Sequence, residues 1–354
     1  MLQRIDNITF ARYSQEEYPV LCWQMKEWAE TQPLKGLSIL DATPVFRNTL
    51  IKYKALLLAG VTLSVGITGK IPADPFVLKL LEEEGVPIIT PDQPPCTFDL
   101  VLDCAASFAA YPARIGYVEL TRSGVEIYRK KGSPVYLADS GEIKKIETCL
   151  GTGESYFRAM KQLGYETWEG KNIVVFGSGK VGLGIIAYAH RLGAHITVVT
   201  EPSFITSKVR EYASEIIDVE EEERIIKAIQ NAYAVVTATG IAGAASKCCP
   251  PDVLINSPAL LANMGVEDEY GEDIPFHRVL AGKSPLNFIL EEPTRLKYIE
   301  ATMALHNEGA AYLATHFTSH STTQGVIIPP METEQKMLDI TKRYGVISDE
   351  LLLI

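Results

Sequence analysis

The sequence predicts an α/β protein built from two doubly wound parallel-sheet domains. Three observations lead to this fold class. Short β-branched runs alternate with helical stretches, an order typical of parallel sheets covered on both faces. The chain has 354 residues, enough for two domains of ordinary size. The stretch from 170 to 201 contains a complete strand–turn–helix–strand unit with a glycine-rich turn.

The N-terminal half is predicted to form the first of these alternating sheets. The expected strands are Leu37–Leu40, Val61–Ile67, Val86–Ile89 and Asp99–Leu102, and the expected helices are Tyr18–Glu30, Val45–Gly60 and Asp74–Gly85. Ligands of doubly wound sheets bind beyond the carboxyl ends of the strands. Asp41, Asp103 and Glu119 lie at that edge, and together they form a candidate polar site. Taken alone, Asp41 or Asp103 is better explained as the cap of the loop that follows it.

The glycine-rich turn lies in the second half, between a β-branched run at 173–176 and an apolar helix that ends near Leu192. It reads Gly177-Ser178-Gly179-Lys180-Val181-Gly182, a full GxGxxG. Gly177 permits the tight turn, Gly179 lets a pyrophosphate approach the backbone, and Gly182 lets the helix pack close to the strand. The phosphates would lie at the helix N-terminus, where free N–H groups favour an anion. The alternative is a glycine-rich turn in an α/β domain that binds no dinucleotide.

An acidic residue stands where a dinucleotide site needs one. Glu201 follows the second strand of this unit, Ile196–Val199. A carboxylate there accepts hydrogen bonds from both adenosine-ribose hydroxyls and repels a 2′-phosphate. The sequence therefore predicts NAD, rather than NADP, as the cofactor.

Composition excludes several classes of partner. The net charge of −11 argues against nucleic acid or an anionic membrane as the main partner. No apolar run is long enough to span a bilayer, and the N-terminus lacks the apolar region of a signal peptide. The six cysteines have no metal-binding spacing, so we expect no metal site and a cytoplasmic protein. We also expect a homo-oligomer, with the apolar end Leu351–Ile354 packing on a second copy of the chain.

Short motifs along the chain stand in a recognisable order. They are DLVLDCAASFA at 99–109, ELTRSGV at 119–125, DSGEIKKIETCLGTGES at 139–155, GKNIVVFGSGKVGLG at 170–184, VVTE at 198–201, TATG at 237–240 and NMG at 263–265. This order resembles a shortened, divergent S-adenosylhomocysteine hydrolase (adenosylhomocysteinase). The resemblance implies a substrate-binding domain at 1–152 and a Rossmann NAD-binding domain at 153–302. It also implies that the C-terminal segment 303–354 packs back on the first domain.

The resemblance also implies site residues. Cofactor contacts beyond the glycine-rich turn and Glu201 would come from Thr121, Ser123, Thr148, Thr237, Thr239, Gly240 and Asn263. Catalytic candidates are Asp103, Glu119, Lys144, Glu147 and His306, the last near the start of a helix expected at Thr302–Phe317 that precedes a polar loop at Ser319–Thr323. A half-exposed histidine at a hinge is the alternative for His306. Several family catalytic positions are changed, to Pro44, Cys104, Leu120, Ile143 and Val266.

We therefore expect an NAD-binding protein that acts on a hydroxyl-bearing, nucleoside-like small molecule. In the family that the chain resembles, NAD oxidises a ribose hydroxyl and NADH reduces the product ketone, so the overall reaction is redox-neutral. Two alternatives remain open. One is an NAD-dependent dehydrogenase that releases NADH. The other is a catalytically inactive NAD-binding regulator.

Overall fold

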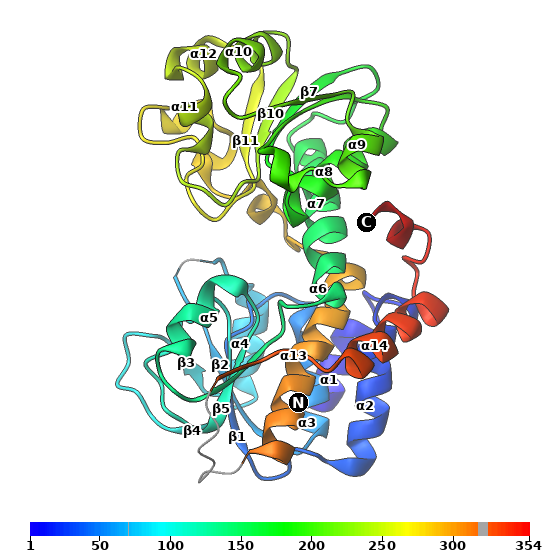
Figure 1. Ribbon diagram of the computed structural model, residues 1–354. Coiled ribbons are helices and arrows are strands. Elements are labelled where there is room, and N and C mark those ends of the chain that lie inside the picture. Colours follow the sequence, from blue (N-terminus) through cyan, green and yellow to red (C-terminus); the bar gives the residue numbers. More distant parts are fainter. Residues whose placement is uncertain (70, 318–324) are drawn as a thin grey trace. The chain divides into compact units, whose positions relative to one another are not determined.

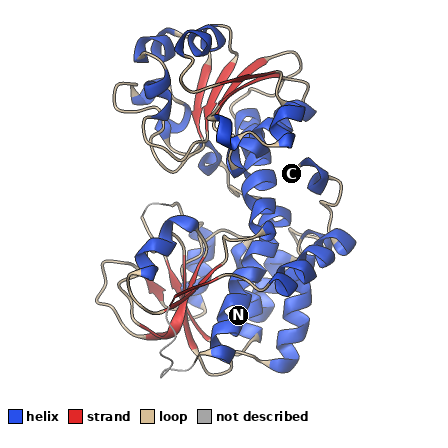
Figure 2. Ribbon diagram, in the orientation of Figure 1, coloured by secondary structure: helices blue, strands red, loops and turns tan. Residues whose placement is uncertain are grey.

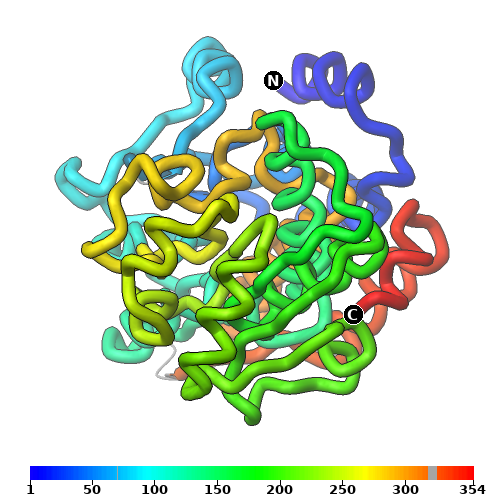
Figure 3. Tube along the Cα trace, turned by 90° about the horizontal axis from the view of Figure 1, so that it is seen from above, coloured from blue at the N-terminus to red at the C-terminus, as the bar shows by residue number. Residues whose placement is uncertain are grey.

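The computed structural model describes residues 1–69, 71–317 and 325–354. The chain forms two compact units: unit 1 comprises Met1–Lys144 and Arg295–Ser348, and unit 2 comprises Lys145–Thr294 and Asp349–Ile354. Each unit is an α/β fold with its own parallel sheet, which confirms the predicted fold class (Figures 1 and 2). The course of the chain can be followed in Figure 3.

The unit boundaries differ from the expected domain boundaries. The sequence placed them at 152/153 and 302/303, whereas the units divide at 144/145 and 294/295. Residues 349–354, expected with the first domain, belong to unit 2. The helix expected from Thr302 begins at Leu296, because its buried side chains already start there. The polar loop expected at 319–323 lies outside the described residues.

Unit 1 contains a seven-stranded sheet in the order β12-β6-β5-β4-β1-β2-β3, with every pairing parallel. The strands are β1 Ser38–Asp41, β2 Thr62–Gly66, β3 Ile88–Ile89, β4 Phe98–Asp103, β5 Ala113–Glu119, β6 Pro134–Leu137 and β12 Gly325–Ile327. The helices are α1 Leu2–Thr9, α2 Pro19–Thr31, α3 Thr49–Leu58, α4 Pro75–Glu83, α5 Arg122–Arg129, α6 Glu142–Lys145, α13 Leu296–His316 and α14 Met331–Tyr344. Because β1 lies between β2 and β4, the strand order reverses at β1 and β4.

The side chains of this sheet alternate between two cores. Ile39 and Val118 pack with α1–α4, α13 and α14 on one face, while the neighbouring Leu40 and Tyr117 pack with α5 on the other. Helix α3 begins at Thr49, later than expected. The Thr49 hydroxyl donates to the Pro44 carbonyl at 2.8 Å and so holds a turn ahead of the helix.

Unit 2 contains a five-stranded parallel sheet in the order β11-β10-β7-β8-β9. The strands are β7 Asn172–Phe176, β8 His195–Val199, β9 Glu215–Ile217, β10 Ala234–Thr237 and β11 Leu260–Asn263. The helices are α7 Thr152–Gln162, α8 Lys180–Arg191, α9 Ser207–Tyr212, α10 Glu222–Gln230, α11 Ala244–Cys248 and α12 Pro251–Asn256, and a π-helix, η2 Ile146–Gly151, precedes α7. This order is that of a Rossmann half, with its reversal between β7 and β10.

The unit 2 sheet is also covered on both faces. Ile173 and Val175 of β7 face the core formed with α7, α8 and α9, and Val174 and Phe176 face the core formed with α10, α11 and α12. This double burial explains why its strands read as continuous apolar runs. Within the described part of the chain, we find no helix that combines the length and apolar character needed to cross a membrane.

Candidate functional site

The glycine-rich turn follows β7 at the point where the unit 2 strand order reverses. Gly177 has a φ of +92°, and a Cβ there would lie 2.5 Å from the Ala238 carbonyl oxygen. A Cβ on Gly182 would lie 2.1 Å from the Gly177 carbonyl oxygen. At Gly179, the N-cap of α8, a Cβ would meet nothing within 4 Å. The turn is therefore tight on its inner side and open beside the α8 N-terminus, as a bound pyrophosphate requires.

Ser178 of the turn points inward rather than toward a ligand. Its side chain is buried, donates to the Phe204 carbonyl at 3.0 Å and accepts from the Thr200 hydroxyl at 2.9 Å. The hydroxyl therefore ties the turn to the segment after β8. Lys180 and Val181 are half-buried in the first turn of α8. Of the predicted turn contacts, the Ser178 side chain is used for positioning.

Glu201 is presented by that tied segment. It directly precedes a short 3₁₀ helix, η3 Pro202–Phe204, and its side chain is exposed. Its carboxylate has no hydrogen-bond or ion-pair partner among the described residues. An exposed carboxylate at the end of the second strand can accept hydrogen bonds from ribose hydroxyls without giving up a protein contact.

The turn after β10 is held by a buried glutamate that the sequence did not single out. Glu269 accepts from the Thr239 backbone N–H and hydroxyl, both at 2.8 Å, and from the Gly240 N–H at 2.7 Å. Gly265 must be glycine, since a Cβ would lie 1.9 Å from the Glu269 carboxylate. Thr239 and Gly240, expected to contact the cofactor, thus direct these groups to Glu269. The only sequence signal was the acidic run Glu267-Asp268-Glu269 after the NMG motif.

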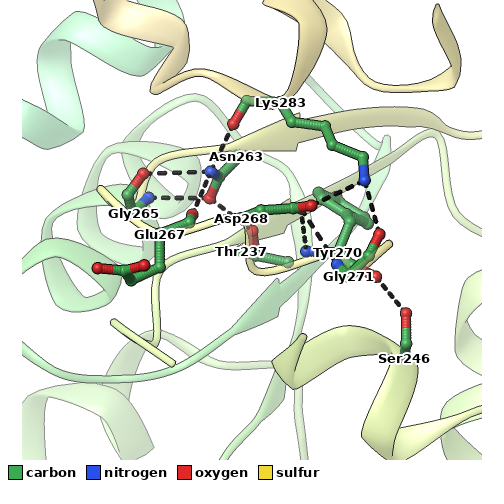
Figure 4. A network of polar contacts seen from close by, with 9 residues as sticks. All are labelled: Thr237, Ser246, Asn263, Gly265, Glu267, Asp268, Tyr270, Gly271 and Lys283. Atoms are coloured by element: carbon green, nitrogen blue, oxygen red, sulfur yellow. Dashed lines mark hydrogen bonds and ion pairs between the residues drawn. The ribbon is translucent and has the colours of Figure 1, made fainter. Parts of the chain in front are cut away.

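Thr237 and Asn263 are fully buried and hold the same edge together (Figure 4). The Thr237 hydroxyl donates to the Asn263 side-chain oxygen at 3.1 Å. The Asn263 amide nitrogen donates to the backbone carbonyls of Gly265, Glu267 and Lys283. Both residues were expected to contact the cofactor, and the structure uses their side chains to fix loops instead.

In unit 1, the two candidate catalytic carboxylates brace loops. Asp103 accepts from the N–H groups of Cys104 at 2.7 Å and Phe108 at 2.8 Å, and from the Tyr128 hydroxyl. Glu119 accepts from the N–H groups of Ala105, Ala106 and Thr121 and from the Thr121 hydroxyl, at 2.6–3.0 Å. Both side chains are fully buried. This geometry favours the loop-capping explanation and not a free acid or base.

Burial dominates the electrostatics of this pair. It raises the pKa of Asp103 to about 6, against the hydrogen bonds from Tyr128 and the loop. It also raises the pKa of Glu119 to about 7, and the nearby charge of Asp103 adds to that effect. The bound loop carries two alanines in the left-handed region, Ala105 at φ +56° and Ala106 at φ +52°. The Glu119 carboxylate thus holds a strained turn at the carboxyl edge of the sheet.

His306 lies in the core of unit 1 and has no exposed surface. Its Nε2 lies 3.1 Å from the Val118 carbonyl, which can only accept, so Nε2 carries the proton. Its Nδ1 then accepts from the Thr43 hydroxyl at 3.3 Å. Burial lowers the pKa of His306 to about 3, and the charge of Lys52 adds to this. The ring is a neutral core group with both nitrogens engaged, unlike the half-exposed or active-site histidine expected.

Beside it, the loop after β1 is closed by an ion pair. Asp41 and Lys52 have no exposed side-chain surface and contact each other directly. Asp41 also accepts from the Thr43 N–H at 3.0 Å. The corresponding turn of unit 2 is the open glycine-rich turn. Lys52 was not singled out from the sequence, because a lysine within an expected helix reads as a solvated residue.

The remaining candidates lie on loops and helices of both units. Thr121 is half-buried and Ser123 exposed at the start of α5, 3.1 Å apart through their hydroxyl oxygens. Lys144 is buried in α6 of unit 1. Glu147 and Thr148 are half-buried in the π-helix η2 of unit 2. Short π-helical stretches often accompany functional sites.

Comparison with known proteins identifies part of unit 2. Residues 167–251 match a family model described as "Putative NAD(P)-binding". No curated protein matches the chain. A dipicolinate synthase from Bacillus halodurans has a similar structure, with a TM-score of 0.50, 13% identity and coverage of 79% of this chain and 98% of that one.

Two further solved structures match with lower scores. A transhydrogenase from Sinorhizobium meliloti has a TM-score of 0.44, 14% identity and coverage of 81% and 98%. A D-lactate dehydrogenase from Lactobacillus jensenii has a TM-score of 0.38, 12% identity and coverage of 80% and 99%. At these identities the likeness concerns the fold alone. The family match and the geometry of the turn agree on one assignment: unit 2 is an NAD(P)-binding domain of the Rossmann type.

Proposed function

We propose that this protein binds NAD through unit 2 and uses it in hydride chemistry on a hydroxyl-bearing small molecule. The observation that carries the proposal is the open space at Gly179, at the N-terminus of α8 and on the same sheet edge as the exposed Glu201 carboxylate. The pyrophosphate would lie against the α8 N-terminus and the adenosine ribose against Glu201. When bound, the nicotinamide supplies a hydride acceptor or donor.

The choice of NAD over NADP rests on charge. The Glu201 carboxylate has no cationic partner among the described residues, so it would repel a 2′-phosphate without compensation. Its segment is held in place by Ser178 and Thr200, which fixes the distance between the phosphate turn and the ribose acid.

Unit 1 is not proposed as a second dinucleotide site, although its strand order reverses in the same way. Its first turn is filled by the buried Asp41–Lys52 pair and by Thr43. A phosphate would have to displace an ion pair that is already shielded from water. This contrast supports a single cofactor site, in unit 2.

The narrower proposal is chemistry like that of adenosylhomocysteinase, on a nucleoside-like substrate. It is supported by the order of the sequence motifs from 99 to 265. The engagement of Asp103, Glu119 and His306 inside unit 1 favours a second candidate, an NAD-binding protein without catalytic activity. A third, the net dehydrogenase, requires only the cofactor site and a substrate hydroxyl.

One set of measurements separates these candidates. NAD and NADP are titrated first, and equal affinity for both would refute the cofactor assignment. The NAD-loaded protein is then mixed with S-adenosylhomocysteine and with simple hydroxy compounds, while homocysteine and NADH are measured. Homocysteine release without net NADH identifies the redox-neutral enzyme, and net NADH identifies the dehydrogenase. Binding of NAD without turnover of any of these compounds identifies the inactive binder.

A further inference from the structure

One face of α14 carries charges of alternating sign. Four exposed residues recur there every three or four positions and therefore share a helix face. From the N-terminal end they are Glu332, Lys336, Asp339 and Arg343, which we call the charge stripe. The buried residues of α14, Met337 and Thr341, lie on the opposite face and pack into unit 1. The stripe therefore points to solvent (Figure 1).

Such a stripe commonly serves ion pairs within its own helix, but here the charges do not pair with one another. Among the described residues, its one ion pair joins Lys336 to Glu27 of α2 at 3.9 Å. Asp339 accepts from the Gln335 side-chain amide at 2.8 Å. The Arg343 guanidinium lies over the Tyr344 ring, 5.3 Å from its centroid. The stripe therefore keeps charge available for a partner.

The stripe lines a groove of about 840 Å³ between α14 and α2. Trp23 of α2 lies at its side, under the Lys336 ammonium at 3.9 Å. At the two ends of the α14 segment, Met331 is 83% exposed and Tyr344 is 56% exposed. An apolar surface at both ends of a charged stripe is typical of a protein interface and unusual for a solvated helix.

The pattern is symmetric about the middle of the helix. Glu332 and Arg343 lie equally far from the point between Met337 and Leu338, and so do Lys336 and Asp339. The exposed Met331 and Tyr344 form a third such pair. If a second α14 lies antiparallel to the first, each acid faces a base and each apolar end faces an apolar end. A parallel second helix would set like charges against each other.

We propose that α14 is the contact surface of a homodimer, with the α14 helices of two copies antiparallel about a two-fold axis. A two-fold interface needs a surface that is complementary to itself, and the charge stripe meets this condition. The apolar ends and Trp23 supply surface to bury, while the charges select the antiparallel register. The proposal is independent of the NAD site, because all these residues belong to unit 1.

The test uses two variants of opposite sign. Lys336→Glu/Arg343→Glu makes the stripe entirely acidic, and Glu332→Lys/Asp339→Lys makes it entirely basic. Each alone sets like charges together, and we expect the dimer Kd to rise by roughly tenfold or more at low salt. Mixed, the two variants should form heterodimers of near wild-type affinity. Lys342→Glu, an exposed charge of α14 outside the stripe, is the matched control and should not change dimerisation.

Sedimentation equilibrium on the full chain gives the readout, and circular dichroism verifies that each variant is folded. A monomeric wild type at concentrations of about 100 μM, where even weak specific pairs with a Kd near 10 μM associate, overturns the proposal. Dimers of undiminished affinity in both single-sign variants also overturn it. Failure of the mixed variants to associate overturns the antiparallel register.

Discussion

The buried Glu269 offers a sharp test of how the cofactor edge of unit 2 is held. We consider Glu269→Gln, which keeps the shape of the side chain and removes its charge. The carboxylate accepts three hydrogen bonds, from the Thr239 N–H and hydroxyl and from the Gly240 N–H. A glutamine has one acceptor oxygen. With that oxygen facing Thr239, its NH₂ group opposes the Gly240 N–H, donor against donor.

The magnitude follows from those contacts. A hydrogen bond to a charged group contributes about 1.5–3 kcal/mol, and a neutral one about 0.5–1.5 kcal/mol. The variant loses one charged bond and weakens two, so we expect unit 2 to lose about 2–4 kcal/mol of unfolding free energy. The side chain cannot move aside toward Gly265, where even a Cβ would be only 1.9 Å from the carboxylate. A loosened Thr239–Gly240 turn should also weaken NAD binding.

The assay is urea unfolding followed by the fluorescence of Trp168, the one tryptophan of unit 2, after Trp23 and Trp28 are replaced by phenylalanine. Glu267→Gln is the control, because Glu267 is exposed and only its backbone carbonyl takes part in the network. The control should stay within about 0.5 kcal/mol of the wild type. If Glu269→Gln behaved like the control, the turn would be held by other contacts and the reasoning would be wrong.

Four further outcomes follow from the structure. Glu201→Ala should weaken NAD by about 1–3 kcal/mol in a titration, through loss of hydrogen bonds to the ribose. Gly179→Val should abolish NAD binding without unfolding the protein, and unchanged affinity would place the dinucleotide elsewhere. Lys52→Met leaves Asp41 buried without its cation and should cost about 3–5 kcal/mol in urea unfolding. Since burial raises the pKa of Glu119 from its ordinary 4.5 to about 7, the folded state binds the extra proton. Wild-type stability should therefore fall relative to Glu119→Gln as the pH rises between these values.

The parts of the molecule that sequence predicted are those determined by local pattern. The β7 turn is one example, because Gly177, Gly179 and Gly182 act within a few residues of one another. The parallel sheets are another, since a strand buried on both faces must be apolar throughout. These features require no knowledge of distant residues.

The partners of buried polar groups could not be predicted in this way. His306 meets Thr43 and Val118, which are 263 and 188 residues away along the chain. Glu269 meets Thr239 across 30 residues. A sequence shows that a carboxylate or imidazole is present, but not which N–H group or carbonyl the fold brings to it. Residues chosen by resemblance, Asp103 and Glu119 among them, therefore proved to brace loops.

The two units share one device that neither motif nor composition reveals. In unit 1, Glu119 ends the fifth strand and holds the turn after the fourth, at Ala105 and Ala106. In unit 2, Glu269 follows the fifth strand and holds the turn after the fourth, at Thr239 and Gly240. In both units the fourth strand lies beside the first, where a doubly wound sheet presents its ligand site.

An internal carboxylate at this place satisfies backbone N–H groups that would otherwise attract an anion. With the fourth-strand turn neutralised in both units, an anionic ligand can bind only at the first-strand turn. Unit 1 has closed that turn with the Asp41–Lys52 pair, and unit 2 has left it open at Gly179. The same scaffold thus yields one anion site and one sealed edge, and it directs the phosphates of a dinucleotide to the N-terminus of α8.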